Sequence, residues 1–325
     1  VSRGLGDVYK RQKMYSFVIP CYNSSESIRH VVELTMEEME KMNRREFEFV
    51  LVNDYSSSTK TMPVLKKLAE EYPCVTVLNL AKNAGQHNAI MAGLNYAKGD
   101  ILIGMDDDMQ THPSQLPYLF EELEKGYDIV YGYYPEKKHS AFRNFGSWVN
   151  YISVRILIGK PKELKTSSYW VARKFVRDSV IEYQAPYAYI QGLFLRTTRN
   201  ISCIPIQHFQ REEGESNYTF KRLLKLWSNI IGFSITPLRL TEYCGFGLSL
   251  LSIIAAVVVL IRKILNPAMA LGWPSLMIVI CFFSGIQLMF LGLIGEYIGR
   301  MFLGLNRQPQ YVIREVIRQE SEEQE

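Results

Sequence analysis

The stretch Ile101–Pro113, ILIGMDDDMQTHP, joins an apolar run to three consecutive aspartates. The apolar part predicts a buried strand, whereas three adjacent carboxylates repel one another and no fold requires them. Carboxylates at positions i and i+2 beyond a strand can share a divalent cation, and such hard oxygen ligands suit Mg²⁺ or Mn²⁺. The alternative is that Asp108 only precedes the helix near Pro113 and that its neighbours are solvated turn residues. We favour the metal site because Asp54 ends a neighbouring predicted strand.

Around this stretch, β-rich runs alternate with helical patterns between residues 16 and 131. Alternation at this spacing predicts a parallel α/β sheet, in which ligands bind at the carboxyl ends of the strands. No GxGxxG follows the first run, which disfavours a dinucleotide-binding Rossmann domain. The predicted strands are 16–20, 47–53, 75–80, 100–105 and 127–132, and the predicted helices are 25–42, 63–72, 86–97 and 113–126.

Polar residues follow four of the predicted strands. We expect these clusters to meet at one edge of the sheet, because the carboxyl ends of parallel strands lie together. The clusters are Pro20–Asn23, Asn53–Asp54, Asn83–Gln86 and Asp106–Asp108.

The second half of the chain is apolar. The whole sequence has 325 residues, a formal net charge of +4 and 47% hydrophobic residues, but no charged residue occurs in Tyr243–Ile261 or in Ile264–Gly295. The densest part, Trp273–Ile294, has about the ~20 residues that a membrane helix needs. These runs predict a hairpin of two transmembrane helices. The alternative is a pair of fully buried helices in a soluble protein.

The segment before the first apolar run has the pattern of a basic amphipathic helix. Its apolar residues recur at helical spacing from Phe220 to Ile231, and its cations lie off that stripe. Such a helix beside a membrane span is typical of an interfacial helix, although a core-packing helix has the same pattern. Just upstream, Arg211 can bind a phosphate bidentately and Ser216 can donate a hydrogen bond to it. The alternative for Arg211 is an ion pair with a neighbouring glutamate.

The cysteines and flanking cations indicate how the chain is oriented. Its five cysteines have no pairing or metal-binding spacing, which fits reduced thiols in a cytosol-facing protein. Cations flank the predicted spans on the side of both ends of the chain, which favours both ends in the cytoplasm, although Arg262 and Lys263 argue mildly against it. The leader, residues 1–13, has no apolar core of a signal peptide, and we expect it to be disordered or a non-native extension.

Several ordered motifs resemble a known family: VIPCYN (18–23), VND (52–54), NAGQHNAIMAG (83–93), DDDMQTHP (106–113), REEGESNY (211–218) and GEYIGR (295–300) with QPQYVIREV (308–316). In this order, the set resembles the family-2 glycosyltransferases that load sugars onto polyprenyl phosphate. The likeness is strongest to the bacterial undecaprenyl-phosphate aminoarabinose and glucosyl transferases, relatives of dolichol-phosphate mannose synthase. It covers roughly Met14 to Ile317.

The resemblance implies a GT-A fold followed by an interfacial helix and two transmembrane helices. It also implies a nucleotide-sugar donor, in particular a UDP-sugar, an Mg²⁺ or Mn²⁺ ion, inversion at the anomeric carbon and a polyprenyl (undecaprenyl) phosphate acceptor. The expected location is a bacterial inner membrane, with a multi-pass chain, a cytosolic catalytic domain, no nucleic-acid partner and a homo-oligomer, tetrameric by the family pattern. The expected segments are 1–13, a catalytic domain 14–218, a juxtamembrane segment 219–240, spans 241–263 and 273–295, and a cytosolic end 296–325 with an acidic tail.

The family motifs assign roles to individual residues of this chain. Asp106, Asp108 and Arg211 are the expected catalytic residues; Asp108, with Asp106, is expected to bind the metal; and Arg211 and Ser216 are expected to bind the acceptor phosphate. The expected donor-binding residues are Pro20, Tyr22, Asn23, Glu26, Asp54, Asn83, Gln86, Asp106 and Asp107, with Asp54 on the base or ribose.

One departure from the family pattern bears on activity. Ser168 and Trp170 stand where many relatives carry an Asp and an Arg. A hydroxyl acceptor would need a general base, but a phosphate monoester, with a second pKa near ~6, is already a nucleophile. Positioning and charge neutralisation can then lower most of the barrier. The sequence therefore favours an active transferase, with a catalytically inactive nucleotide-sugar sensor as the alternative. A processive polysaccharide synthase is disfavoured, because a QxxRW-like motif is missing and the spans are too few.

Overall fold

The computed structural model describes residues 13–135, 155, 159–207, 236–265 and 272–319. The predicted leader up to residue 12, Arg211 and Ser216, most of the amphipathic segment and the acidic tail 320–325 lie outside the described residues.

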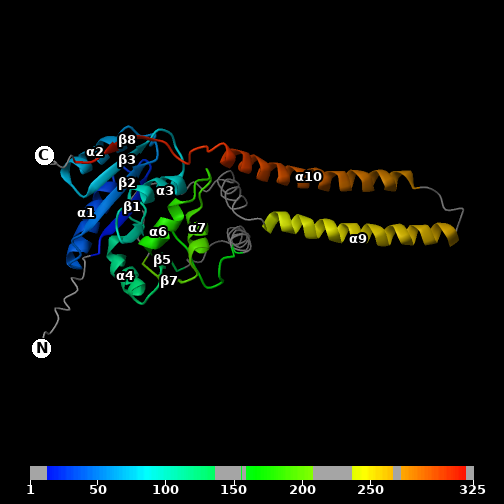
Figure 1. The fold of residues 1–325 in the computed structure, drawn as a ribbon, viewed down its shortest axis with the longest axis horizontal. Helices are drawn as coiled ribbons and strands as arrows, with labels where there is room; N and C mark the ends of the chain where they lie inside the picture. The colour runs from blue at the N-terminus through cyan, green and yellow to red at the C-terminus, as the bar shows by residue number, and fades with distance from the viewer. Residues whose placement is uncertain (1–12, 136–154, 156–158, 208–235, 266–271, 320–325) are drawn as a thin grey trace, which may run out of the picture.

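An eight-stranded sheet in the order β7-β5-β6-β4-β1-β2-β3-β8 forms the centre of the α/β domain (Figure 1). The first four predicted strands pair in parallel as expected: β1 with β2 and β4, and β2 with β3. The strands are β1 (Tyr15–Cys21), β2 (Phe47–Asn53), β3 (Val75–Leu80), β4 (Ile101–Gly104), β5 (Ile129–Tyr133), β6 (Trp170–Arg173), β7 (Ile201–Pro205) and β8 (Ile313–Ile317).

Two strands depart from the expected parallel sheet. β6 lies between β4 and β5 and is antiparallel to both, and β8 is antiparallel to β3 at the edge. The chain reaches both strands through connections that lie outside the regular strand–helix alternation. The alternation that predicts parallel pairing therefore does not extend to them.

Helices cover both faces of the sheet and enclose two hydrophobic cores. One core lies under α1 (Ile28–Lys41), α2 (Thr61–Glu71) and α4 (Leu116–Glu124), the last preceded by the 3-10 turn η1 (Pro113–Gln115). The other lies under α3 (Gln86–Tyr96), α6 (Lys174–Ile181) and α7 (Ile190–Thr197). Close packing of α3 depends on Gly93, where a Cβ would come within 2.4 Å of a methyl group of Val18. This glycine lets α3 approach the centre of the sheet.

Two long helices, α9 (Thr236–Leu265) and α10 (Trp273–Leu305), extend away from the α/β domain and lie side by side (Figure 1). Each contains a stretch long and apolar enough to cross a membrane, Thr236–Val259 and Phe282–Leu305. The side chains described in these stretches are largely exposed, which argues against the alternative of buried soluble helices.

The last strand links the two halves of the chain. β8 follows α10 but pairs with β3 of the α/β domain, from Val77 opposite Ile317 to Leu80 opposite Ile313. Lys66 of α2 adds an ion pair to Glu315 of β8 at 3.3 Å. The segments before α9 and after α10 therefore belong to one folded domain. If α9 and α10 cross a membrane, they cross it as a hairpin.

Candidate functional site

The predicted polar clusters come together at one edge of the sheet. We call this the acidic edge; it comprises the carboxyl ends of β1, β2 and β4 and the start of α3. The register places Cys21 beside Asn53, and β4 lies on the other side of β1. The parallel pairing thus brings together residues that lie up to eighty positions apart in the sequence.

Asp54 holds the loop before α3. It is only 4% exposed, and its carboxylate accepts hydrogen bonds from the backbone N–H groups of Ala84 at 2.6 Å and Gly85 at 2.9 Å. The Asn83 amide donates to the same carboxylate at 3.1 Å and to the Asp54 carbonyl at 2.9 Å. Gly85 has φ +85°, which an L side chain rarely adopts. The predicted residues Asp54 and Asn83 are therefore joined to each other and fix the position of Gln86.

Asn23 joins the loop after β1 to the loop after β2. It lies in the left-handed region at φ 59°, where Asn is one of the few tolerated residues. Its side chain donates to Ser57 at 3.0 Å and accepts from the Ser58 N–H at 2.9 Å. Of the other predicted donor residues in this loop, Pro20 lies in β1, and Tyr22 and Glu26 are exposed.

The three aspartates after β4 point in different directions. The Asp107 carboxylate accepts from the Tyr22 N–H at 3.0 Å, and burial raises the pKa of Asp107 while this N–H lowers it. Asp106 and Asp108 instead both act on Tyr134, since burial and then these two carboxylates raise the pKa of the Tyr134 hydroxyl. That Asp106 and Asp108 share a metal ion stays a prediction.

Two hydrogen-bond donors from different segments hold the Asp106 carboxylate in place. Gln86 of α3 donates to one oxygen at 3.0 Å, and the Ser168 hydroxyl donates to the other. The Asp106 N–H in turn donates to the Thr111 hydroxyl at 2.9 Å. Ser168, which stands where many relatives carry an Asp, thus bonds directly to the acidic edge.

Asp108 belongs to a tight turn. Its carboxylate accepts from the Gln110 N–H at 3.1 Å, and Met109 between them has φ 63°. Tyr134 donates to the Gln110 carbonyl at 2.6 Å. Sequence reasoning missed Tyr134, although it directly follows β5, and the rule that ligands gather at strand ends could have found it.

Trp170 belongs to the hydrophobic core, whereas Ser168 contacts the acidic edge. It is 1% exposed in β6, and its ring packs edge-on against Phe194 with centroids 4.8 Å apart. A Cβ at Gly104 would come within 2.2 Å of the indole, so the ring lies directly over the β4 backbone. The site of the expected Arg is therefore filled by core packing.

The acidic edge fits a divalent ion only together with a ligand. Among the described residues, no group of three or more His, Cys, Asp and Glu side chains has the arrangement of a metal site. Mg²⁺ is commonly held by one or two carboxylates together with substrate phosphates. Asp106 and Asp108, two positions apart after β4, would supply those carboxylates.

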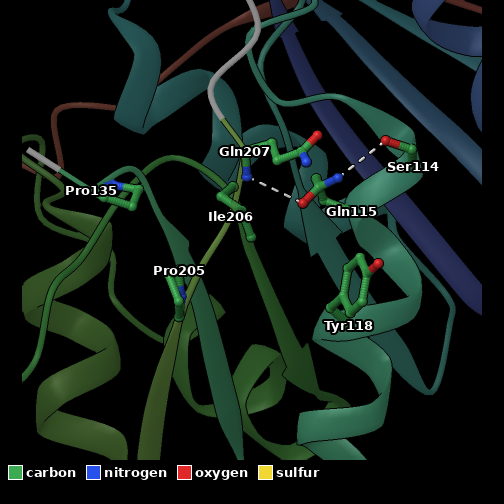
Figure 2. Close-up of a pocket in the computed structure, with 7 residues that line it drawn as sticks. All are labelled: Ser114, Gln115, Tyr118, Pro135, Pro205, Ile206 and Gln207. Carbon is green, nitrogen blue, oxygen red and sulfur yellow. Dashed lines mark hydrogen bonds between the residues drawn. The ribbon is translucent and has the colours of Figure 1, made fainter. Parts of the chain in front are cut away.

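An open cavity of about 700 Å³ lies beside η1 and the end of β7 (Figure 2). Gln115 spans it, donating to Ser114 at 3.2 Å and accepting from the Gln207 N–H at 3.2 Å. The cavity is lined by Ser114, Gln115, Tyr118, Pro135, Pro205, Ile206 and Gln207.

His87, next to Gln86, is half-buried and electrically neutral near pH 7. Burial lowers its pKa from 6.5 to about 4, and its ring packs edge-on against Tyr189 with centroids 5.1 Å apart. Because the folded-state pKa is depressed, His87 stabilises the fold above about pH 6.5, and this contribution is lost as the pH falls toward 4. The difference amounts to about 3 kcal/mol.

We therefore expect His87→Gln to weaken the dependence of stability on acid. The thermal unfolding midpoint of the full chain in detergent should fall more steeply between pH 6.5 and pH 4.5 for the wild type than for the variant. Asp107 titrates in both proteins, so its contribution cancels in the comparison. Equal acid shifts in the two proteins would show that His87 is not buried in its neutral form.

Comparison with known proteins assigns the chain to a family. A family profile described as "Glycosyl transferase family 2" matches residues 16–183. The undecaprenyl-phosphate 4-deoxy-4-formamido-L-arabinose transferase of Edwardsiella ictaluri is 33% identical over 98% of this chain and 99% of its own length. The enzyme of the same name from Pseudomonas savastanoi pv. phaseolicola is 33% identical over 95% of this chain and 93% of its own.

Solved structures with a similar fold include glucosyl-3-phosphoglycerate synthase from Mycobacterium tuberculosis. Its complex with phosphoglyceric acid has a TM-score of 0.48 at 15% identity, covering 68% of this chain and 80% of that one. The expected GT-A domain followed by two long apolar helices is confirmed. This chain belongs to glycosyl transferase family 2 and is a glycosyltransferase.

Proposed function

We propose that this glycosyltransferase moves a sugar from a nucleotide diphosphate, in particular UDP, to polyprenyl phosphate with inversion at the anomeric carbon. The observation that supports it most is similarity over nearly the whole chain, apolar helices included, to two enzymes named for undecaprenyl-phosphate sugar transfer. An acceptor with a long polyprenyl tail lies in a membrane, so an acidic edge tethered to two apolar helices suits it.

We place the donor at the acidic edge. Tyr22, Asn23 and Glu26 border the nucleotide, Gln86 borders the sugar, and Asp106 and Asp108 would hold Mg²⁺ or Mn²⁺ against the diphosphate. When bound, the ion neutralises charge that develops on the leaving diphosphate. Asp54 we assign to holding the 83–85 loop, in keeping with its three hydrogen-bond donors there.

The transfer needs no side-chain base. An oxygen of the acceptor phosphate bonds to the anomeric carbon as the bond from that carbon to the diphosphate breaks, and the nucleoside diphosphate leaves with the electron pair. The acceptor oxygen is already deprotonated at cytosolic pH. Ser168 then keeps the Asp106 carboxylate in place with Gln86 and removes no proton.

Arg211 and Ser216 are the proposed partners of the acceptor phosphate. They lie outside the described residues, but Gln207, at the cavity of Figure 2, is only four positions before Arg211. Four residues of extended chain span at most about 14 Å. This cavity is therefore the part of the described surface closest along the chain to the proposed phosphate partners.

The proposal can be tested by nucleotide release from the full chain in liposomes. With the right UDP-sugar, UDP should appear only when undecaprenyl phosphate is present in the bilayer. UDP release at the same rate with and without undecaprenyl phosphate would contradict the acceptor assignment. Tight binding of nucleotide-sugars without any release would instead support the inactive sensor, which family membership and the named relatives do not favour.

We further propose that the catalytic domain and the segment after Arg300 face the cytosol of a bacterial inner membrane. Because β8 pairs with β3, both segments lie on the same side. A cysteine introduced at Asn266, between the two apolar helices, should react with an impermeant thiol reagent in intact cells. The matched control is a cysteine at Arg318, after β8. Labelling at position 318 but not at 266 would show that the chain has the opposite orientation in the membrane.

A further inference from the structure

A second cavity, of about 520 Å³, lies at the edge of the sheet opposite the acidic edge. We call it the basic cavity; it is lined by Asn95, Tyr96, Ala97, Lys98, Lys174, Arg177 and Arg318. α3 connects the two edges: Gln86 at its start bonds to Asp106, and Tyr96 at its end lines the cavity. At ~1.5 Å per residue, the two ends of α3 are about 15 Å apart.

The basic cavity brings together cations from three distant parts of the sequence. Lys98 follows α3, Lys174 and Arg177 belong to α6, and Arg318 follows β8. Like charges gathered around one cavity repel one another, and packing alone does not call for such an arrangement.

Few carboxylates offset this charge. Among the described residues, the recorded ion pair joins Arg177 to Asp178 at 2.8 Å, and no ion pair is recorded for Lys98, Lys174 or Arg318. Two other carboxylates are nearby: Glu48 accepts from the backbone N–H of Lys98 at 2.6 Å and from the Ser16 hydroxyl. Asp100, whose carbonyl accepts from the Lys174 N–H at 2.9 Å, accepts from the Met14 N–H at its carboxylate.

Arg177 is held in place with one donor unused. It donates to the Ala97 carbonyl at the end of α3, whereas its buried Nε has no hydrogen-bond partner. The hydrogen bond to Ala97 fixes the guanidinium beside the other cations of the cavity. Tyr96, 39% exposed, adds an aromatic surface to the same cavity.

We propose that the basic cavity is a second anion site, which takes a phosphate-bearing solute such as a phosphate monoester or a diphosphate. One phosphate can accept hydrogen bonds from lysine and arginine at once. Because Arg318 follows the strand that returns from the membrane helices, the anion would tie β8 to α3 and α6. This inference does not depend on the identity of the acceptor.

Two other sources of negative charge are considered. A lipid headgroup is disfavoured because β8, which Arg318 follows, lies on the side of the domain remote from α9 and α10 (Figure 1). The glutamates at 320, 322, 323 and 325 follow Arg318 closely in sequence. However, exposed carboxylate–lysine pairs contribute little each, whereas a phosphate concentrates charge and acceptors in one group.

The test is binding of inorganic phosphate and of pyrophosphate to the full chain in detergent, at constant ionic strength, by calorimetry. K98Q/R318Q should weaken binding at least about tenfold, since each charged hydrogen bond lost is worth about that factor. K174Q provides a second variant with a smaller change. The charge-matched control K41Q/K125Q removes two lysines that pair with glutamates on their own helices, and it should bind phosphate like the wild type.

Three outcomes would overturn the proposal. The first is phosphate binding that K98Q/R318Q leaves unchanged, since the anion would then bind elsewhere on the protein. The second is binding that appears only after E320Q/E322Q/E323Q/E325Q, which would make the acidic tail the occupant. The third is a loss of binding to anionic-lipid vesicles in K98Q/R318Q without a loss of phosphate binding, which would make the cavity a lipid site.

Discussion

Asp108→Asn should lower sugar transfer by about 100- to 1000-fold, the usual cost of removing one group that stabilises charge in a transition state. Tyr134 bonds to this turn at the Gln110 carbonyl, and the Asp106 and Asp108 carboxylates both raise the pKa of its hydroxyl. Asparagine keeps the size of the side chain and can still accept from Gln110, but it loses the negative charge that a divalent ion requires. The measurement is initial rate against Mg²⁺ and Mn²⁺ concentration.

The matched control for this variant is Asp100→Asn. Asp100 lies at the other end of β4, where its carboxylate accepts from the Met14 N–H at 3.2 Å. This change should leave the metal dependence unaltered. If chelators do not diminish transfer by the wild type, the metal assignment of Asp106 and Asp108 is wrong, whatever Asp108→Asn does.

Arg211→Ala should suppress transfer to polyprenyl phosphate while donor binding stays nearly the same. Losing a desolvated charge partner costs ~2–5 kcal/mol, or roughly 30- to 5000-fold, against about 0–1 kcal/mol for a surface ion pair. Lysine at 211 should rescue only part of the activity, because an ammonium cannot bind two phosphate oxygens as a guanidinium does. Rates at varied lipid concentration, with donor affinity from calorimetry, separate the two effects.

Arg45→Ala is the control for Arg211→Ala, since Arg45 is exposed in the connection between α1 and β2. It should change neither lipid dependence nor donor affinity. A loss of donor affinity in Arg211→Ala, with the apparent affinity for lipid retained, would place the arginine in the donor pocket. That result would also leave the acceptor phosphate without its proposed partner.

The sequence predicts the acidic edge well because parallel pairing of β1, β2 and β4 follows from a regular alternation of strands and helices. Once that pairing is known, the residues after each strand must lie together, and Asp54, Asn83 and Gln86 do so. These predictions depend on short-range patterns only.

Other features depend on contacts between distant segments, which no local pattern encodes. The antiparallel pairing of β8 with β3 joins residues that lie more than two hundred positions apart, on either side of the apolar helices. Ser168 and Trp170 are two positions apart in the sequence, yet their side chains have different surroundings. The Ser168 hydroxyl bonds to Asp106, whereas the Trp170 ring packs in the core over Gly104. The family role expected at both positions therefore gave no guide to either contact.

Some expectations stay predictions. The roles of Arg211 and Ser216, the interfacial helix and the tetramer concern segments or assemblies that the described residues do not include. The identity of the sugar depends on the shape of the donor pocket around Gln86 when it is occupied, which the residue types alone do not determine.

The mass of the lipid product tests the central claim most directly. The full chain is reconstituted in liposomes with undecaprenyl phosphate and Mg²⁺ or Mn²⁺, then incubated with each of a panel of UDP-sugars. We predict one donor that yields undecaprenyl phosphate carrying a single sugar residue, with an equal amount of UDP released and product formed about 100- to 1000-fold more slowly by Asp108→Asn. Longer glycans, or a lipid of unchanged mass with every donor although the protein binds nucleotide-sugar, would contradict the proposed function.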